Sequence, residues 1–128
     1  MKIRRNEYPE VRNFLLAELR WSERPLTRDD LVERTLTMAR GTWGYTWTRT
    51  TAARRVREAI AALNDHGEPV VSTGDGYRLA RTAEEIDTAA RRLEQTGKAC
   101  LWRAARIRRI PIGQVARQLG LFEEVANG

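Results

Sequence analysis

The chain has 128 residues, of which 41% are hydrophobic and 31% charged, a composition that supports one compact domain with an appended helical tail and excludes intrinsic disorder. No apolar run approaches the ~18 residues of a membrane span, so we expect no transmembrane helix. The net charge of +6 favours an anionic partner. The positive charge is clustered, since eight basic residues and one acidic residue lie between Arg91 and Arg117. A single cysteine, and no apolar stretch behind the basic residues 1–5, predict a cytoplasmic protein without a secretory signal.

The first predicted helix covers residues 9–21. Its apolar residues share one helical face, and a proline stands in the first turn, where its missing amide costs no hydrogen bond. These residues are Pro9, Val11, Leu15, Leu16 and Leu19. A second helix is predicted to start at the cap Thr27, with Asp29 and Asp30 at the positive end of its dipole, and to end near residues 40–41.

An aromatic segment follows over residues 41–48. Trp43, Tyr45 and Trp47 alternate with a period of two, which predicts a short strand or an extended loop. Two interpretations remain open. In the first, this strand pairs with a later hairpin and buries its rings; in the second, the rings contact bases or a partner protein.

A third helix is predicted to start within residues 48–51 and to end at residues 66–67. A β-branched strand at residues 70–72 then turns through Gly74, Asp75 and Gly76 into residues 77–79. A basic helix followed directly by a two-stranded hairpin is typical of a winged helix-turn-helix, which usually binds duplex DNA.

Residues 56–80, which read VREAIAALNDHGEPVVSTGDGYRLA, resemble the amino-terminal DNA-binding domain of biotin operon repressors. The likeness lies in a helix, a glycine turn, a hydrophobic pair and a closing Gly-Tyr-x-Leu. It extends over roughly residues 10–81 and is shared with small phage-encoded winged-helix proteins that continue into a basic helix. The chain departs from this pattern at residues 41–48, because a helix-turn-helix normally joins its last two helices through 3–4 residues. The ligase domain of biotin operon repressors is missing, so the resemblance implies no ligase activity.

In the DNA-binding interpretation, the start of the third helix enters the major groove. Threonines there contact phosphates, arginines reach guanine edges or the backbone, and two wing arginines touch the backbone beside the groove. The predicted contacts are Arg49, Thr50, Thr51, Arg54, Arg55, Arg57, Arg78 and Arg81. The alternative is that these arginines only solvate an exposed helix face.

A long basic helix is predicted over residues 82–110, starting at a capping box of Thr82 and Glu85. Apolar and small residues recur within it at alternating steps of four and three, which indicates a narrow seam over residues 86–107. This seam docks on the preceding domain or pairs two chains as a homodimer. Its members are Ile86, Ala90, Leu93, Gly97, Cys100, Ala104 and Ile107.

Outside the seam, Arg103 and Arg106 are candidate phosphate contacts, and Trp102 beside them is a candidate partner contact. A last short helix is predicted over residues 112–119, with Phe122 as a further apolar member. The predicted domains are a winged helix-turn-helix over residues 1–81 and a basic helical extension over residues 82–128.

Catalytic signals are weak. The single histidine, His66, lies at a predicted helix end, and Cys100 lies on the apolar seam, which predicts a buried thiol rather than a nucleophile. No spacing of cysteines and histidines indicates a metal site, so we expect no enzyme, no cofactor and no metal.

The fold class predicted is therefore mainly α with a small β-hairpin wing and a long basic C-terminal helix. The predicted function is duplex DNA binding by a bacterial or phage transcriptional regulator. The alternative is a winged-helix interaction module that inhibits or recruits a host protein or nucleoprotein complex. Its contacts would be Trp43, Tyr45, Trp47 and Trp102.

Overall fold

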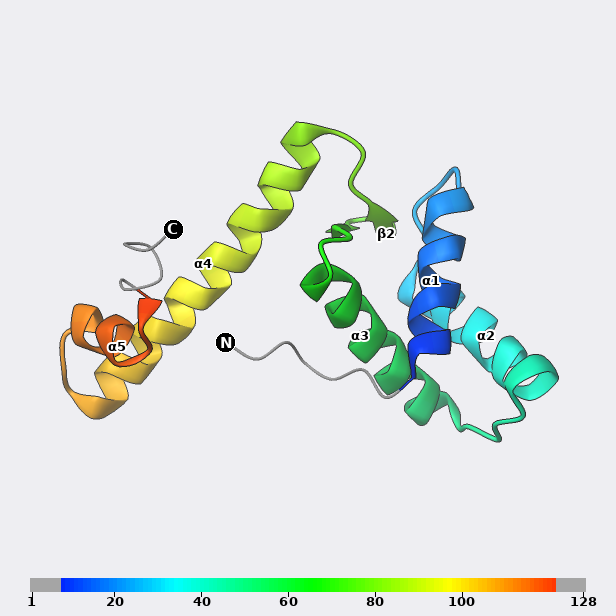
Figure 1. Ribbon diagram of the computed structural model, residues 1–128, viewed down its shortest axis with the longest axis horizontal. Helices are drawn as coiled ribbons and strands as arrows, with labels where there is room; N and C mark the ends of the chain where they lie inside the picture. Colours follow the sequence, from blue (N-terminus) through cyan, green and yellow to red (C-terminus); the bar gives the residue numbers. More distant parts are fainter. Residues whose placement is uncertain (1–7, 122–128) are drawn as a thin grey trace. The chain divides into compact units, whose positions relative to one another are not determined.

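The computed structural model describes residues 8–121, and it is mainly helical with one two-stranded antiparallel sheet (Figure 1). This confirms the predicted class of a mainly α chain with a small hairpin. Two compact units divide the chain within the long helix, between Ala89 and Ala90. The elements in chain order are α1 (Pro9–Trp21), α2 (Arg28–Met38), η1 (Ala39–Trp43), α3 (Arg49–Asp65), β1 (Val70–Thr73), β2 (Gly76–Leu79), α4 (Ala83–Arg108) and α5 (Ile112–Gln118).

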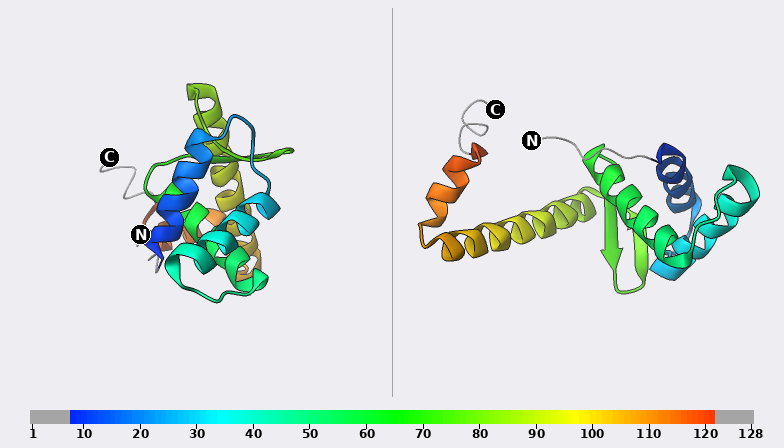
Figure 2. Two further views of the ribbon diagram at one scale, coloured as in Figure 1. Left: turned by 90° about the vertical axis from the view of Figure 1, so that its right-hand side faces the viewer. Right: turned by 90° about the horizontal axis from the view of Figure 1, so that it is seen from below.

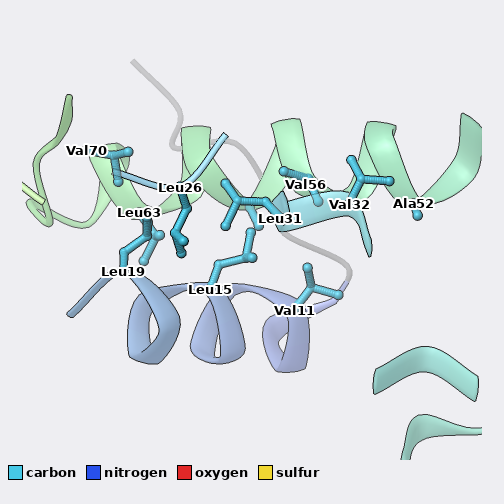
Figure 3. Close-up of a cluster of buried hydrophobic side chains, with 11 residues drawn as sticks. Val11, Leu15, Leu19, Leu26, Leu31, Val32, Ala52, Val56, Leu63 and Val70 are labelled. Carbon is cyan, nitrogen blue, oxygen red and sulfur yellow. The ribbon is translucent and has the colours of Figure 1, made fainter. Parts of the chain in front are cut away.

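The core of the first unit lies between α1, α2 and α3. Figure 3 shows the side chains of Val11, Leu15 and Leu19 pointing from α1 toward α3, and all three are buried. Their spacing of four residues is the period that the sequence predicts for this helix. The other members of the buried cluster are Leu26, Leu31, Val32, Ala52, Val56, Ala59, Leu63 and Val70.

Helix α2 starts at the predicted cap Thr27, which forms a capping box with Asp30. The Thr27 hydroxyl accepts the backbone N–H of Asp30 at 3.0 Å, and the Asp30 carboxylate accepts the backbone N–H of Thr27 at 3.0 Å. The hydrogen bonds from Thr27, with a smaller contribution from Arg24, lower the pKa of Asp30 below its usual value. Since a lowered pKa stabilises the fold only while the carboxylate is ionised, this contribution is lost as the pH falls below about 4.

Thr27→Ala is expected to destabilise the first unit by about 1 kcal/mol, because the Asp30 amide loses its acceptor at the start of α2. Urea unfolding of the full chain measures the change. Thr27→Ser, which keeps the hydroxyl, is the matched control and should unfold close to the native midpoint. Equal losses in both variants would show that the capping hydrogen bond contributes nothing.

The aromatic segment does not form the predicted strand. Residues Ala39–Trp43 continue α2 as a π-helical turn, and Gly44 ends this turn with φ +76°, a conformation that glycine adopts without steric cost. Residues 45–48 belong to no helix or strand, and Thr48 has extended backbone angles. The predicted loop therefore begins only after Gly44. Trp43 belongs to the helical turn before it, so the period of two in the aromatic residues does not mark a β-strand.

The hairpin pairs Val70 with Leu79 at its open end and Thr73 with Gly76 at its tip, and Figure 2 shows the two strands side by side. Its outer neighbour is Leu26, which exchanges two backbone hydrogen bonds with Tyr77, at 2.9 and 2.7 Å. The interpretation that residues 43–47 pair with the hairpin is wrong, because none of these residues takes part in a strand or bridge and Leu26 is the residue that pairs with β2.

Helix α4 starts one residue after the predicted cap and ends two residues before the predicted end. The Thr82 hydroxyl accepts the Glu85 amide at 3.1 Å, as the capping box predicts. At the other end, Arg109 has φ +55°, and the Ile110 N–H donates to the Ala105 carbonyl, an arrangement typical of helix C-termini. The short helix α5 follows, and Phe122 lies outside the described residues.

Candidate nucleic-acid interface

The outer face of α3 consists of Thr50, Arg54 and Arg57, which are all exposed. Steps of four and three residues place them on one side of the helix. The opposite side carries buried residues, among them Val56 and Leu63. Packing of α3 on α1 and α2 therefore turns two arginines and a hydroxyl toward solvent together.

The cap of α3 exposes its first backbone amides at the same end. The Thr48 hydroxyl accepts the Thr51 N–H at 3.2 Å and lies 3.2 Å from the Thr51 hydroxyl. Thr51 thus takes part in the cap, while Thr50 points outward from the first turn. A helix N-terminus with its amides directed at solvent favours an anion.

Arg54 and Arg57 form no ion pair or hydrogen bond with the part of the chain that the structure describes, residues 8–121. Their guanidinium groups keep all of their donors for an external acceptor. In this they differ from the other arginines that the sequence places near α3.

Arg49 bridges α3 to α2. Its guanidinium group donates to Asp29 at 3.1 Å and to Glu33, and these hydrogen bonds, chiefly the one to Glu33, raise the pKa of Arg49. The positive charge is therefore balanced by two carboxylates. Arg49 ties the start of α3 to its neighbour, a role that the sequence alone did not reveal.

Arg55 lies on the flank of α3 that faces the start of α1. Its guanidinium carbon is 4.2 Å from the centre of the Tyr8 ring, and it pairs with Glu58 at 3.1 Å. Only 15% of the Arg55 side chain is exposed. A cation stacked on an aromatic face and paired with a carboxylate is held by the protein itself.

Three of the four aromatic residues predicted as partner contacts, Trp43, Tyr45 and Trp47, pack on each other and against α1 and the residue before it. Tyr45 stacks on Trp47 with ring centres 4.6 Å apart, and Trp43 meets Phe14 edge-on at 5.7 Å. The Tyr45 hydroxyl donates to Glu10 at 2.8 Å, which raises the pKa of Tyr45 because ionisation would place a phenolate beside this carboxylate. These contacts give the rings a structural role in joining the turn after α2 to α1.

The two wing arginines are also engaged. Arg78 pairs with Glu85 at 3.1 Å, and Arg81 donates to the Ser22 carbonyl at 3.1 Å. The hairpin tip itself is exposed at Gly74 and Asp75. Both arginines thus fasten the hairpin to its surroundings, and the tip adds no positive charge.

In the second unit, Arg103, Arg106 and Trp102 are all exposed on α4, Trp102 to 47%. Cys100 is exposed, so the prediction of a buried thiol is wrong. Residues 90–100 of α4 are all exposed, so the apolar seam that would have buried this thiol is not covered by the described residues of its own unit.

Within residues 8–121, no group of three His, Cys, Asp or Glu side chains is placed to hold a metal ion. None of the helices in this range has the length and apolar character required to cross a bilayer. No protein-family model, curated protein or solved structure matches the chain.

Proposed function

We propose that the chain is a winged helix-turn-helix protein that binds duplex DNA and acts as a transcriptional regulator. The observation that carries the proposal is the outer face of α3, where Thr50, Arg54 and Arg57 lie together without protein partners among the described residues. The order of elements supports it. A winged helix-turn-helix has the same succession of elements as this chain: one helix, a short bridged segment (here the single residue Leu26), two further helices and a hairpin.

The outer face has the chemistry that the major groove requires. Arg54 and Arg57 can each present two parallel N–H groups to the O6 and N7 atoms of guanine, or donate to phosphate oxygens. Thr50 and the open amides of the first turn suit a phosphate at the edge of the groove. The three side chains span about two turns of helix, roughly 10 Å of axis, which matches a few successive base pairs.

The remaining predicted contacts divide into two groups in this proposal. Arg49, Arg55, Arg78 and Arg81 hold α3 and the hairpin in position through protein contacts. Arg103 and Arg106 add positive charge that attracts DNA without reading its sequence.

The experiment that tests the proposal is a titration of a short mixed-sequence duplex with the full chain across a salt series. We expect measurable binding at low salt, with the logarithm of the affinity falling linearly as the logarithm of the salt concentration rises, by about 0.9 per phosphate neutralised. The absence of binding at low salt would contradict the proposal in spite of the net charge of +6.

The alternative of a protein-interaction module is weakened at its predicted contacts. Three of these four side chains already make ring contacts within the protein. They pack against each other and against Tyr8 and Phe14, and they are Trp43, Tyr45 and Trp47. Interface hot spots are usually aromatic side chains that are free to enter a partner's pocket. Of the four predicted partner contacts, Trp102 alone retains such exposure, so we base the proposed function on α3.

A further inference from the structure

Helix α4 carries large apolar side chains that remain in solvent. Ile86 is 48%, Leu93 62% and Ile107 83% exposed, and Cys100 between the last two is also exposed. They follow each other at intervals of seven residues and so occupy one side of the helix. A run of such side chains along about 30 Å of helix marks a surface that a partner covers.

The shorter helix α5 leaves this side open. In the second unit, Ala105 of α4 and Val115 and Ala116 of α5 are buried, and Arg108 donates to Gln118 at 3.0 Å. These contacts cover the flank of α4 next to the seam. Ile107 nevertheless keeps most of its surface exposed, so the covering partner is not α5.

The other seam positions are all small. Ala90, Gly97 and Ala104 alternate with the large residues, again at intervals of seven. In a parallel pair of identical helices, each seam residue would face the same residue of the other helix. Pairs of large residues would then alternate along the seam with pairs of small residues that leave the space between the helices nearly empty. In an antiparallel pair, Leu93 and Ile107 can each face an alanine of the other helix, which fills these layers and lets the backbones approach closely.

The distribution of charged residues along α4 also favours an antiparallel pair. The first half of α4 carries four acidic residues and two basic ones, while the second half carries four basic residues and no acidic one. An antiparallel pair sets each acidic half beside a basic half, and it also opposes the two helix dipoles favourably. A parallel pair would stack the two basic halves on each other.

We propose that the α4 seam (Ile86, Ala90, Leu93, Gly97, Cys100, Ala104 and Ile107) binds the same seam of a second copy of this chain in antiparallel orientation. In the register that we propose, Leu93 lies opposite Ala104 of the second copy, Ala90 opposite Ile107 and Gly97 opposite Cys100, while Ile86 lies opposite residue 111, just beyond the end of α4. The same register brings Asp87 beside Arg108 of the second copy. This inference does not depend on the proposed function.

Cysteine cross-linking tests the orientation and register in a Cys100→Ser background. Leu93→Cys combined with Ala104→Cys is expected to give a disulfide-linked dimer on mild oxidation. Leu93→Cys alone is expected to stay uncross-linked, because the two copies of residue 93 lie about 16 Å apart along the axis. The same distance prevents a bond within one chain. A cross-link by Leu93→Cys alone would overturn the antiparallel orientation, and no cross-link in either protein would overturn the pairing.

Sedimentation equilibrium tests the association itself. The native chain is expected to dimerise at micromolar concentrations, and Leu93→Glu to raise the dissociation constant at least about tenfold by placing a charge against the apolar layer. Gln95→Glu adds the same charge on the opposite side of α4 and should leave the constant unchanged. A native chain that stays monomeric, or equal effects of both variants, would contradict the proposal.

Discussion

Replacing Arg54 and Arg57 together with alanine is expected to lower the affinity for duplex DNA on the order of a hundredfold at moderate salt, since each arginine contact contributes about 1–3 kcal/mol. The salt dependence should become shallower, by about 0.9 for each arginine that contacts a phosphate. Fluorescence anisotropy with a labelled duplex measures both quantities. Alanine is the best helix former, and neither side chain has a protein partner among the described residues, so α3 should remain folded.

The matched control removes the same charge elsewhere. Arg20→Ala combined with Arg117→Ala replaces two exposed arginines, one on α1 and one on α5. If DNA binding is local to α3, this control should lose affinity only by the modest factor that a change of two charges produces at a distance. Equal losses in both double variants would mean that the chain binds DNA by net charge, and that α3 has no special part.

The largest expected effect on stability comes from Gly76→Ala. Gly76 has φ +135°, which side chains rarely adopt, and a Cβ atom there would lie 2.5 Å from the carbonyl oxygen of Leu26. The close approach exists because Leu26 pairs with Tyr77 at the edge of the hairpin. We expect a loss of about 3 kcal/mol or more in the free energy of unfolding, from backbone strain and a broken bridge.

Urea unfolding followed by tryptophan fluorescence measures this change. In a Trp102→Phe background, the signal comes from Trp21, Trp43 and Trp47, all in the first unit. Gly74→Ala, two residues earlier in the turn, is the matched control, because its Cβ would meet nothing within 4 Å. It should change stability by less than about 0.5 kcal/mol. Similar losses in both variants would indicate that the turn, and not the contact with Leu26, sets the requirement for glycine.

Local signals predicted much of the first unit. The face of α1 and the cap at Thr27 follow from the helical period and from capping chemistry, and these depend on residues close in sequence. The pairing of Leu26 with Tyr77 joins residues far apart in the chain and involves one residue only. No periodic pattern accompanies a single bridged residue, so the sequence could not reveal it.

The aromatic segment shows how a correct observation led to a wrong structure. A period of two predicts a strand when neighbouring strands supply hydrogen bonds. Here Trp43 ends a π-helical turn, while Tyr45 and Trp47 follow Gly44 and pack against Tyr8. Packing with distant aromatic residues, and not the local alternation, sets the conformation.

The sequence named the arginines of the candidate site but could not tell which of them make protein contacts. Six arginines of α3 and the hairpin were treated alike in sequence, yet four of them make protein contacts: Arg49, Arg55, Arg78 and Arg81. Asp29 and Glu33, which hold Arg49, lie 16 to 20 residues earlier in the chain. For Arg49, the packing of α2 on α3 is what distinguishes a paired arginine from a free one.

The most direct test of the central claim is a titration of the ¹⁵N-labelled chain with a short duplex, followed by NMR at each amide. We predict that the largest shifts fall on α3 from Thr50 to Arg57. The amides of residues 43–47 should move little, because their side chains pack inside the first unit. Shifts confined to α4 and α5, or to the aromatic residues, would contradict the assignment of α3 as the DNA-binding helix.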